Sequence, residues 1–377
     1  MELVVRKNDL LRELQLFQGI VERKNTIPIL ANVLMEARGD QVSFLATDLE
    51  VGLRSKCSAS VAKGGSLTLP AKKFYEIVKS LPETDIRIAE DKGGVKVAAD
   101  RFDSRMQTLP REDFPTLPDA GSTPTATLSR ASVREMVAKT QFAITGEDTR
   151  YFLNGALFVL RADGMSLVAT DGHRLALVTT PRDGNAASST KKDAKDDGEI
   201  KAILPKKTLG ELARLLTEGD EDIRYERGEN HLFFDVGGRL LISRMIDGQF
   251  PAYERVIPKG NDKHIEFERD RLTSAVKRVA LLSNERSRAV KFQVEKGKVD
   301  ITSSSPDLGE AKETIPVDYA GGAMQICFNA QYVLDFLSAV TNDVVSLDVK
   351  DEVSQAVMKP VGAEGYDYTY VIMPMRV

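Results

Sequence analysis

The sequence is poor in the residues on which disulfides, metal sites and many catalytic sites depend. Its 377 residues include no tryptophan, two cysteines and three histidines. Cys57 and Cys327 lie far apart and outside any Cys-x-x-Cys spacing, which argues against a disulfide framework or a zinc cluster. We therefore expect both cysteines to be buried as small apolar residues, and we expect neither a metal nor a cofactor.

Long apolar runs are also missing. No stretch approaches the roughly 20 apolar residues that cross a bilayer, and residues 1–9 are too charged and too strand-like for a signal peptide. With 42% hydrophobic and 29% charged residues, the composition is typical of a globular protein. We expect a cytoplasmic protein without a membrane partner, long enough for two or three domains.

The chain repeats one pattern three times, and such self-similarity is strong evidence of architecture. Each copy holds a helix-like segment followed by two strand-like segments. The copies are 8–14, 32–37 and 44–48; then 130–136, 154–159 and 167–171; and, more weakly, 271–276, 289–294 and 299–303. A second helix-like segment follows in each copy, at 69–78, 204–213 and 328–337. Each repeat is therefore predicted to contain two helices.

The helices are amphipathic and the strands are short. Helices are predicted at 8–24, 72–79, 129–140, 205–216, 269–279 and 329–340. In the first, Leu10, Leu14, Phe17 and Val21 form an apolar stripe that needs a sheet to cover it. Strands bounded by Gly or Asp turns are predicted at 86–89, 95–98, 157–160, 232–236 and 240–243. This pattern indicates an α+β protein whose repeats each place two helices on one side of antiparallel sheets.

Pro-rich segments separate the repeats. Residues 115–124 are typical of a linker, and residues 250–262 surround a second one. We therefore predict domains at 1–121, 122–254 and 255–377. Residues 181–199 are rich in Asp, Lys, Ser, Ala and Gly without an apolar period, which predicts a mobile surface loop. We assign no function to that loop.

Charge is distributed unevenly along the chain. The formal net charge of −4 does not by itself favour nucleic-acid binding, but five of the six predicted helices carry several basic residues. Basic residues on a single helix usually do no more than keep its outward face solvated. A surface lined by several such helices would meet phosphates without reading bases. These basic residues are Lys72, Lys73, Lys79, Arg134, Lys139, Lys206, Lys207, Arg214, Arg271 and Lys277. The last helix, in which Asp335 is the only charged residue, does not fit this basic pattern and is assigned to packing or to a partner.

Three motifs resemble those of one known family. They are Arg-Tyr-Phe-Leu-Asn-Gly at 150–155, Ala-Thr-Asp-Gly-His-Arg-Leu-Ala at 169–176 and Tyr-Val-Ile-Met-Pro-Met-Arg-Val at 370–377. Together with 26–32 and 281–286, they make the chain resemble the bacterial sliding clamps, the β subunits of DNA polymerase III. The resemblance implies three similar domains and a head-to-tail homodimeric ring with helices lining the hole. It also implies a DNA-replication processivity factor that is not an enzyme.

The resemblance implies a pocket for short, partly apolar peptides. Its partners would be the DNA polymerase III alpha subunit, the clamp loader, and other polymerases and repair factors. Leu and Met side chains would form an adaptable apolar floor, and arginine would hydrogen-bond a carboxylate or carbonyl of the peptide. The implied residues are Leu153, Thr170, Gly172, His173, Arg174, Leu175, Pro251, Arg255, Val256, Asn329, Tyr332, Val353, Met373, Pro374, Met375 and Arg376.

The resemblance also implies contacts with duplex DNA and with a second copy of the chain. Lys24, Tyr151 and Phe152 are at family DNA-contact positions, and the basic helix residues add to them. The predicted contacts with double-stranded DNA, which are independent of base sequence, come from Lys24, Lys72, Lys79, Arg134, Lys139, Tyr151, Phe152, Lys206 and Lys207. Glu147 and Phe152 depart from the family pattern, in which a polar amide and a tyrosine are common. At the dimer interface, Lys72, Ser104 and Met106 would face Leu281 and Leu282.

Two other functions remain compatible with the residues alone. One is a monomeric three-domain scaffold that binds proteins without encircling DNA. The other is a hydrolase using Asp171 and His173, although no nucleophile, orienting third group or metal partner is identifiable. His173 is interpreted as structural or peptide-facing. Without the resemblance, Met373 and Met375 would be read as ordinary strand-core residues.

Overall fold

The computed structural model describes residues 1–21, 26–146, 148–182 and 199–376, and it forms two compact units. Unit 1 is built mainly from residues 1–131 and 207–245, and unit 2 mainly from residues 132–182, 199–206 and 246–376. The division passes through the middle repeat, so each unit combines one terminal repeat with part of the middle one. Lys24, Glu147 and most of the predicted loop at 181–199 lie outside the described residues.

The described residues form six α-helices, two for each repeat, as predicted. Their bounds are α1 Lys7–Leu16, α2 Ala71–Ser80, α3 Arg130–Thr140, α4 Lys206–Leu215, α5 Arg269–Ala280 and α6 Ala330–Ala339. Five agree closely with the predicted ranges. α1 ends earlier than the predicted 8–24, because the chain leaves the helix at Phe17 and continues in turns. The predicted stripe is nevertheless buried, including Phe17 and Val21 beyond the helix end.

Unit 1 contains two antiparallel sheets. The five-stranded sheet has the order β5-β1-β7-β8-β9, and the eight-stranded sheet has the order β10-β15-β16-β17-β4-β3-β2-β6. The strands are β1 Glu2–Arg6, β2 Asn32–Arg38, β3 Gln41–Thr47, β4 Val51–Ser58, β5 Ser60–Lys63, β6 Gly65–Pro70, β7 Asp85–Asp91, β8 Gly94–Ala99, β9 Phe102–Met106, β10 Ala126–Leu128, β15 Ile223–Arg227, β16 His231–Val236 and β17 Arg239–Arg244. Pairing of β17 with β4 joins the middle and first repeats in one sheet.

Unit 2 contains one eight-stranded and one four-stranded sheet. Their orders are β14-β11-β12-β13-β25-β24-β23-β18 and β21-β20-β19-β22. The strands are β11 Gly155–Leu160, β12 Gly164–Thr170, β13 Arg174–Pro181, β14 Ile200–Pro205, β18 Lys263–Glu268, β19 Ala289–Glu295, β20 Lys298–Ser305, β21 Gly309–Pro316, β22 Met324–Asn329, β23 Val344–Val349, β24 Ala356–Pro360 and β25 Asp367–Ile372. Here β13 pairs with β25, which joins the middle and third repeats.

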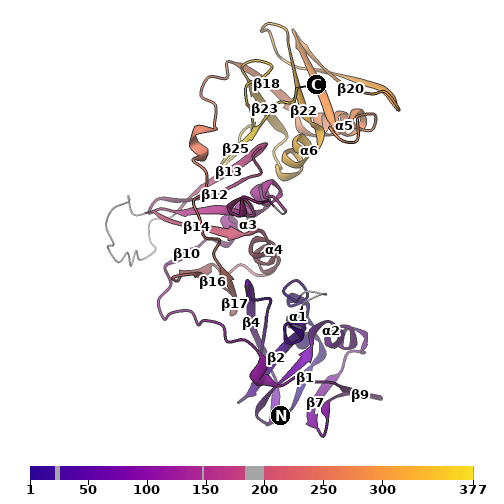
Figure 1. The fold of residues 1–377 in the computed structure, drawn as a ribbon, viewed down its shortest axis with the longest axis vertical. Helices are drawn as coiled ribbons and strands as arrows, with labels where there is room; N and C mark the ends of the chain where they lie inside the picture. The colour runs from indigo at the N-terminus through magenta and orange to yellow at the C-terminus, as the bar shows by residue number, and fades with distance from the viewer. Residues whose placement is uncertain (22–25, 147, 183–198, 377) are drawn as a thin grey trace. The chain divides into compact units, whose positions relative to one another are not determined.

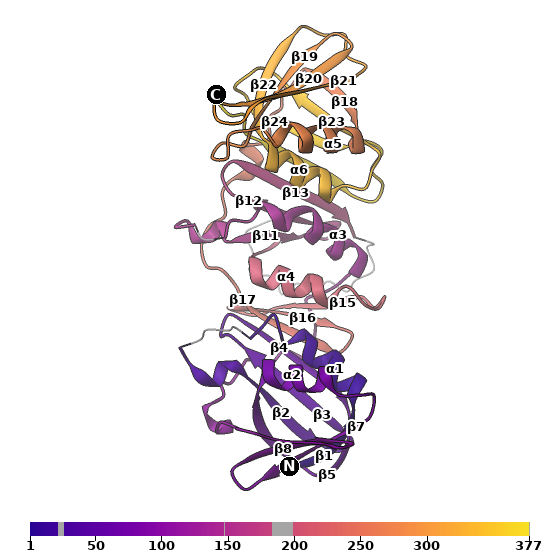
Figure 2. The same cartoon turned by 90° about the vertical axis from the view of Figure 1, so that its right-hand side faces the viewer.

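Pairs of helices cover the sheets. In unit 1, α1 and α2 lie side by side and contact β4, β2 and β6; in unit 2, α5 and α6 do the same against β18 to β22 (Figures 1 and 2). The apolar faces of these helices are buried, with Leu10, Phe74, Leu272 and Phe336 fully enclosed. This arrangement confirms the predicted α+β class with helices packed on antiparallel sheets.

One polar contact recurs in all three repeats. A basic residue at the start of the first helix donates a hydrogen bond to a carbonyl at the C-terminal end of the second helix. The pairs are Lys7 with Leu81, Arg130 with Leu215 and Arg269 with Val340, the last two at 2.8 Å. Because carbonyls at a helix C-terminus lack helical partners and carry partial negative charge, a cation stabilises that end. The repeat is thus preserved at the level of single hydrogen bonds.

Other expectations concern cysteines and membranes. Cys57 and Cys327 are both buried and unbonded to each other, and burial raises the pKa of the Cys57 thiol to about 12. A thiol with so high a pKa stays protonated and inert at neutral pH. Among the described residues, no helix is long and apolar enough to cross a membrane.

Candidate functional site

The Thr-Asp motif of the middle repeat forms a tight turn between β12 and β13. The Asp171 carboxylate accepts hydrogen bonds from the backbone N–H groups of His173 at 2.9 Å and Arg174 at 3.0 Å. The Thr170 hydroxyl donates to the Arg174 carbonyl at 2.7 Å and accepts from the Gly172 N–H at 3.1 Å. Gly172 has a φ of +87°, in the region that glycine adopts without steric cost. The motif therefore places Arg174 rigidly at the start of β13.

The same turn occurs in the first repeat. Thr47 and Asp48 make the equivalent bonds, with the Asp48 carboxylate accepting from the Val51 N–H at 2.7 Å and the Thr47 hydroxyl donating to the Val51 carbonyl at 3.0 Å. Leu49 takes the position of Gly172 and has a φ of +80°. Because the turn recurs where no His follows, the Asp171 and His173 pair is a structural turn rather than a catalytic arrangement.

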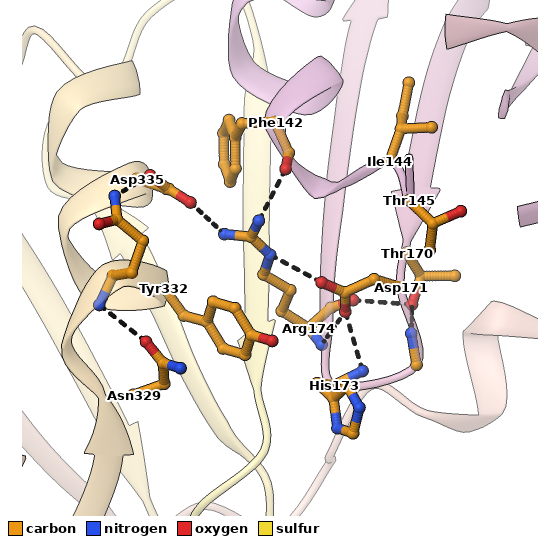
Figure 3. Close-up of polar contacts among 12 residues, drawn as sticks. Phe142, Ile144, Thr145, Thr170, Asp171, His173, Arg174, Asn329, Tyr332 and Asp335 are labelled. Carbon is orange, nitrogen blue, oxygen red and sulfur yellow. Dashed lines mark hydrogen bonds and ion pairs between the residues drawn. The ribbon is translucent and has the colours of Figure 1, made fainter. Parts of the chain in front are cut away.

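Arg174 is the centre of a polar cluster between β13 and α6 (Figure 3). Its Nε donates to Asp171 at 3.1 Å, its Nη1 to Asp335, and its Nη2 to the Phe142 carbonyl at 2.7 Å. The guanidinium carbon lies 4.4 Å from the centroid of the Tyr332 ring. A planar cation held by two carboxylates over an aromatic face is strongly oriented.

The cluster is electrostatically stable at neutral pH. Burial disfavours the charged form of Arg174, but Tyr370 and the ion pair with Asp335 outweigh it and raise the pKa above its ordinary value. Burial also raises the pKa of the Tyr332 phenol. Arg174 is therefore a cation and Tyr332 a neutral hydroxyl across the physiological range, so neither of these two groups serves acid–base catalysis near pH 7.

The segment after β25 runs beside this cluster. Its Met373 N–H donates to the His173 carbonyl at 2.9 Å, and its Met375 N–H donates to the Cys327 carbonyl at 2.7 Å. Met373 is 36% exposed. The structure thus brings His173, Arg174, Tyr332 and the 373–375 segment together, as the resemblance implied.

The remaining residues of the implied pocket differ in exposure. Leu153 and Leu175 are buried, and Leu175 shares a core cluster with Tyr253, which lies in the short 3-10 helix Tyr253–Arg255. That cluster anchors the segment carrying Pro251, Arg255 and Val256. Asn329 caps α6 by accepting a hydrogen bond from the Gln331 N–H at 2.9 Å. Val353 is 60% exposed in the turn before β24.

Most of the implied DNA-contacting residues are accessible. Lys79, Arg134, Lys206 and Tyr151 are exposed, and Phe152, Lys72 and Lys207 are half-buried. Tyr151 is 56% exposed, with its ring 6.0 Å from that of Phe152. Lys207 is already engaged with the Asp48 carboxylate and donates to the Ile20 carbonyl at 3.1 Å. Lys206 also donates to a carbonyl, that of Ile144 at 3.0 Å, but Lys207 in addition holds an ion pair with Asp48 and is therefore less free to meet a phosphate.

Lys139 does not fit the implied DNA contact. Its side chain is 2% exposed, and its Nζ pairs with Glu135 at 2.8 Å and donates to the Ala339 carbonyl at 3.0 Å. The same ammonium lies 4.7 Å from the centroid of the Tyr366 ring and 5.7 Å from that of Tyr368. Assigning Lys139 to DNA was wrong because α3 turns this side chain inward onto the end of α6. Helical position alone does not reveal that neighbour.

The implied dimer residues lie in three places, with Lys72 on α2 and the others on β9 and just after α5. Ser104 and Met106 belong to β9, whose Phe102 is 38% exposed while Met106 is buried. Leu281 follows α5 and is 76% exposed, and Leu282 is half-buried. β9 ends one sheet and β21 ends another, so among the described strands each has one paired neighbour. Free sheet edges are ready sites for pairing with another chain.

Sequence reasoning missed two partners of the cluster. Asp335 had been assigned only to packing or to a partner, and Phe142 was not considered. Neither is visible from spacing, because each lies in a different element from Arg174 and far from it in sequence. No group of three His, Cys, Asp or Glu side chains within the described residues is arranged to hold a metal ion.

Comparisons with known proteins cover the whole chain. Family models of the DNA polymerase III beta subunit match in order: the N-terminal domain at residues 1–118, the central domain at 127–252 and the C-terminal domain at 254–376. The beta sliding clamp of Pseudomonas putida is 38% identical over 380 residues, covering 100% of both chains.

Solved structures agree. The DNA polymerase III subunit beta of Pseudomonas aeruginosa superposes with a TM-score of 0.91 at 36% identity, covering 100% of both chains. A second structure of the clamp from that organism, bound to griselimycin, matches with the same score, identity and coverage. The three family domains, the relatives and the fold all agree, and the chain belongs to the family of DNA polymerase III beta subunits, the beta sliding clamps.

Proposed function

We propose that two copies of this chain close head to tail into a ring around duplex DNA and tether a replicative polymerase to it. The observation that carries the proposal is the match to all three clamp domains, in order, over the full chain. The ring confers processivity and performs no catalysis. We propose domain boundaries at 1–121, 122–254 and 255–377, and the matches at 1–118, 127–252 and 254–376 support three domains in this order.

The proposed dimer seam joins β9 of one copy to β21 of the other. Leu281 is the most exposed of the large apolar side chains among the described residues, and it lies at the end of α5, which packs against β21. A leucine exposed by 76% beside an open strand edge is explained if a second copy covers both. Lys72, Ser104, Met106 and Leu282 complete the proposed seam.

The proposed DNA contacts come from basic side chains on the helices. Lys79 and Arg134 are exposed and present charge without base-reading geometry. Binding of this type is weak, typically about 10⁻⁴ to 10⁻⁶ M at physiological salt, so residence must come from ring closure. The proposed set is Lys24, Lys72, Lys79, Arg134, Tyr151, Phe152, Lys206 and Lys207, with Lys139 left out.

The proposed peptide-binding surface is centred on Tyr332, His173 and Met373. It includes Leu153, Thr170, Gly172, Arg174, Leu175, Pro251, Arg255, Val256, Asn329, Val353, Pro374, Met375 and Arg376. Because a clamp 36% identical to this chain has been solved with griselimycin, we expect this chain to bind griselimycin as well. Its cellular ligands would be short segments of the DNA polymerase III alpha subunit, the clamp loader, and other polymerases and repair factors, all in the cytoplasm.

Light scattering tests the dimer. At micromolar concentration and physiological salt, the mass should be near twice the 41.5 kDa of one chain. Replacing Leu281 and Leu282 with aspartate should give monomers, because the seam would then bury uncompensated charge. Val361→Asp is the matched control, since Val361 is also an exposed apolar residue but lies outside the seam. A wild-type monomer would favour the scaffold function, and a dimer that survives the double substitution would place the seam elsewhere.

A binding assay tests the peptide surface separately. The probe is a fluorescein-labelled peptide copied from the C-terminal tail of the replicative polymerase of the same cell. Deleting residues 373–377 should abolish binding while leaving the fold intact, because β25 ends before that segment. Unchanged affinity would rule out this surface.

A further inference from the structure

Asp335 is held at both carboxylate oxygens. Its Oδ2 accepts from Arg174 Nη1, and its Oδ1 accepts from Gln331 Nε2 at 2.8 Å. Gln331 in turn donates its backbone N–H to the Asn329 side chain at the start of α6. This chain of contacts runs from the helix cap to Arg174 (Figure 3). A carboxylate fixed by its own helix is well suited to orient a partner on another element.

Arg174 has little capacity left for a ligand. Each of its three nitrogen atoms already donates a hydrogen bond within unit 2, and its side chain is 9% exposed. Two of its five N–H groups are not used in these three contacts, but a side chain that is only 9% exposed gives a peptide carboxylate little access to them. The ring of Tyr332, which is half-buried, lies against the guanidinium.

We propose that Asp335 is a positioning residue for the peptide-binding surface, acting through Arg174 to hold the Tyr332 ring in its binding orientation. This inference rests on the proposed function. It also reassigns Arg174, which would support the surface rather than hydrogen-bond the peptide. Charge recognition on this surface would then fall to Arg255 or Arg376, which are exposed.

The effect of losing Asp335 should be confined to side chains. The Tyr332 carbonyl is fixed by the Tyr370 hydroxyl at 2.9 Å, so the backbone of α6 stays in place. Alanine is also a better helix former than aspartate. Arg174 would keep Asp171 and the Phe142 carbonyl but lose the partner that sets the plane of its guanidinium against the ring.

A double-mutant cycle tests the inference with the polymerase-tail peptide as probe. Asp335→Ala should weaken peptide binding about tenfold, the order of loss produced by truncating a residue on which an interface depends. Arg174→Ala should weaken it at least as much. The double variant should bind no more weakly than Arg174→Ala alone, because Asp335 acts only through Arg174.

The control is Asp300→Ala. Asp300 also lies in unit 2, accepts from Thr314 at 2.6 Å and pairs with Lys312 at 2.8 Å, but it belongs to the four-stranded sheet. Its loss should change the melting temperature and leave peptide affinity unchanged. If wild-type protein binds the peptide and Asp335→Ala binds equally well, or if the two effects add, the inference is wrong. If wild-type protein does not bind, the proposed function fails first.

Discussion

Gly172 and Leu49 occupy the same place in two copies of one turn, with φ angles of +87° and +80°. The backbone conformation is therefore set by the Thr-Asp hydrogen bonds and not by the presence of glycine. A side chain at such a φ costs roughly 1–2 kcal/mol. The first repeat bears that cost at Leu49. The middle repeat avoids it, because the residue beside the Arg174 cluster is Gly172.

Gly172→Ala should lower stability by about 1 kcal/mol, because of this φ and because the added Cβ would lie 3.3 Å from the Arg150 guanidinium. Gly210→Ala is the control. Gly210 lies within α4 with open space around its Cα, so alanine there should raise stability by about 0.5–1 kcal/mol. Thermal unfolding measures both, and equal shifts of the two variants would contradict this reading of the turn.

Lys139 and Arg134 lie on the same helix but should have opposite roles. Lys139→Met removes an ammonium that satisfies the Ala339 carbonyl at the end of α6. We expect a loss of about 1–3 kcal/mol in stability with no change in the salt dependence of DNA binding.

Arg134→Ala should do the reverse. Stability should stay the same, and the slope of log affinity for a short duplex against log salt should fall by about one phosphate contact. Titrations of both variants over a range of salt concentrations provide the comparison. A changed slope for Lys139→Met would restore Lys139 to the DNA-facing set.

The helices show how much of the structure could be predicted from the sequence alone. Amphipathic spacing predicted five of six helices closely, because that spacing is a local property of each segment. The inward turn of Lys139 depends on the end of α6, which is distant in sequence, whereas α1 ends early in local turns after Phe17. The implied peptide-site residues came from motif matching, and Asp335 was missed because ion pairing across elements leaves no local pattern.

Arg269→Ala should therefore destabilise the third repeat. Its Nη1 donates to the Val340 carbonyl just past α6, and removing it leaves Lys139 as the cation that still contacts this helix C-terminus. The expected cost is about 1–2 kcal/mol. Arg271→Ala, two residues further along α5 at an exposed position, should be nearly neutral. Denaturant midpoints distinguish the two, and equal midpoints would mean that the recurring contact does not stabilise the helix pair.

At the level of the whole chain, two long sheets each combine strands from neighbouring repeats. β17 pairs with β4 in unit 1, and β13 pairs with β25 in unit 2. Neighbouring repeats therefore share hydrogen-bonded sheet inside each unit rather than meeting only through side chains. The edges that remain open at β9 and β21 are those that the proposed function assigns to the second copy.

Retention on circular against linear DNA tests the central claim most directly. The protein is loaded onto a nicked circular duplex by its clamp loader with ATP, washed at increasing salt, and then released by cutting the circle once. A closed ring should remain on the circle at salt that abolishes phosphate contacts, and it should slide off within minutes of cutting. Equal retention on both forms, lost together as salt rises, would show that electrostatic affinity and not encirclement holds the protein on DNA.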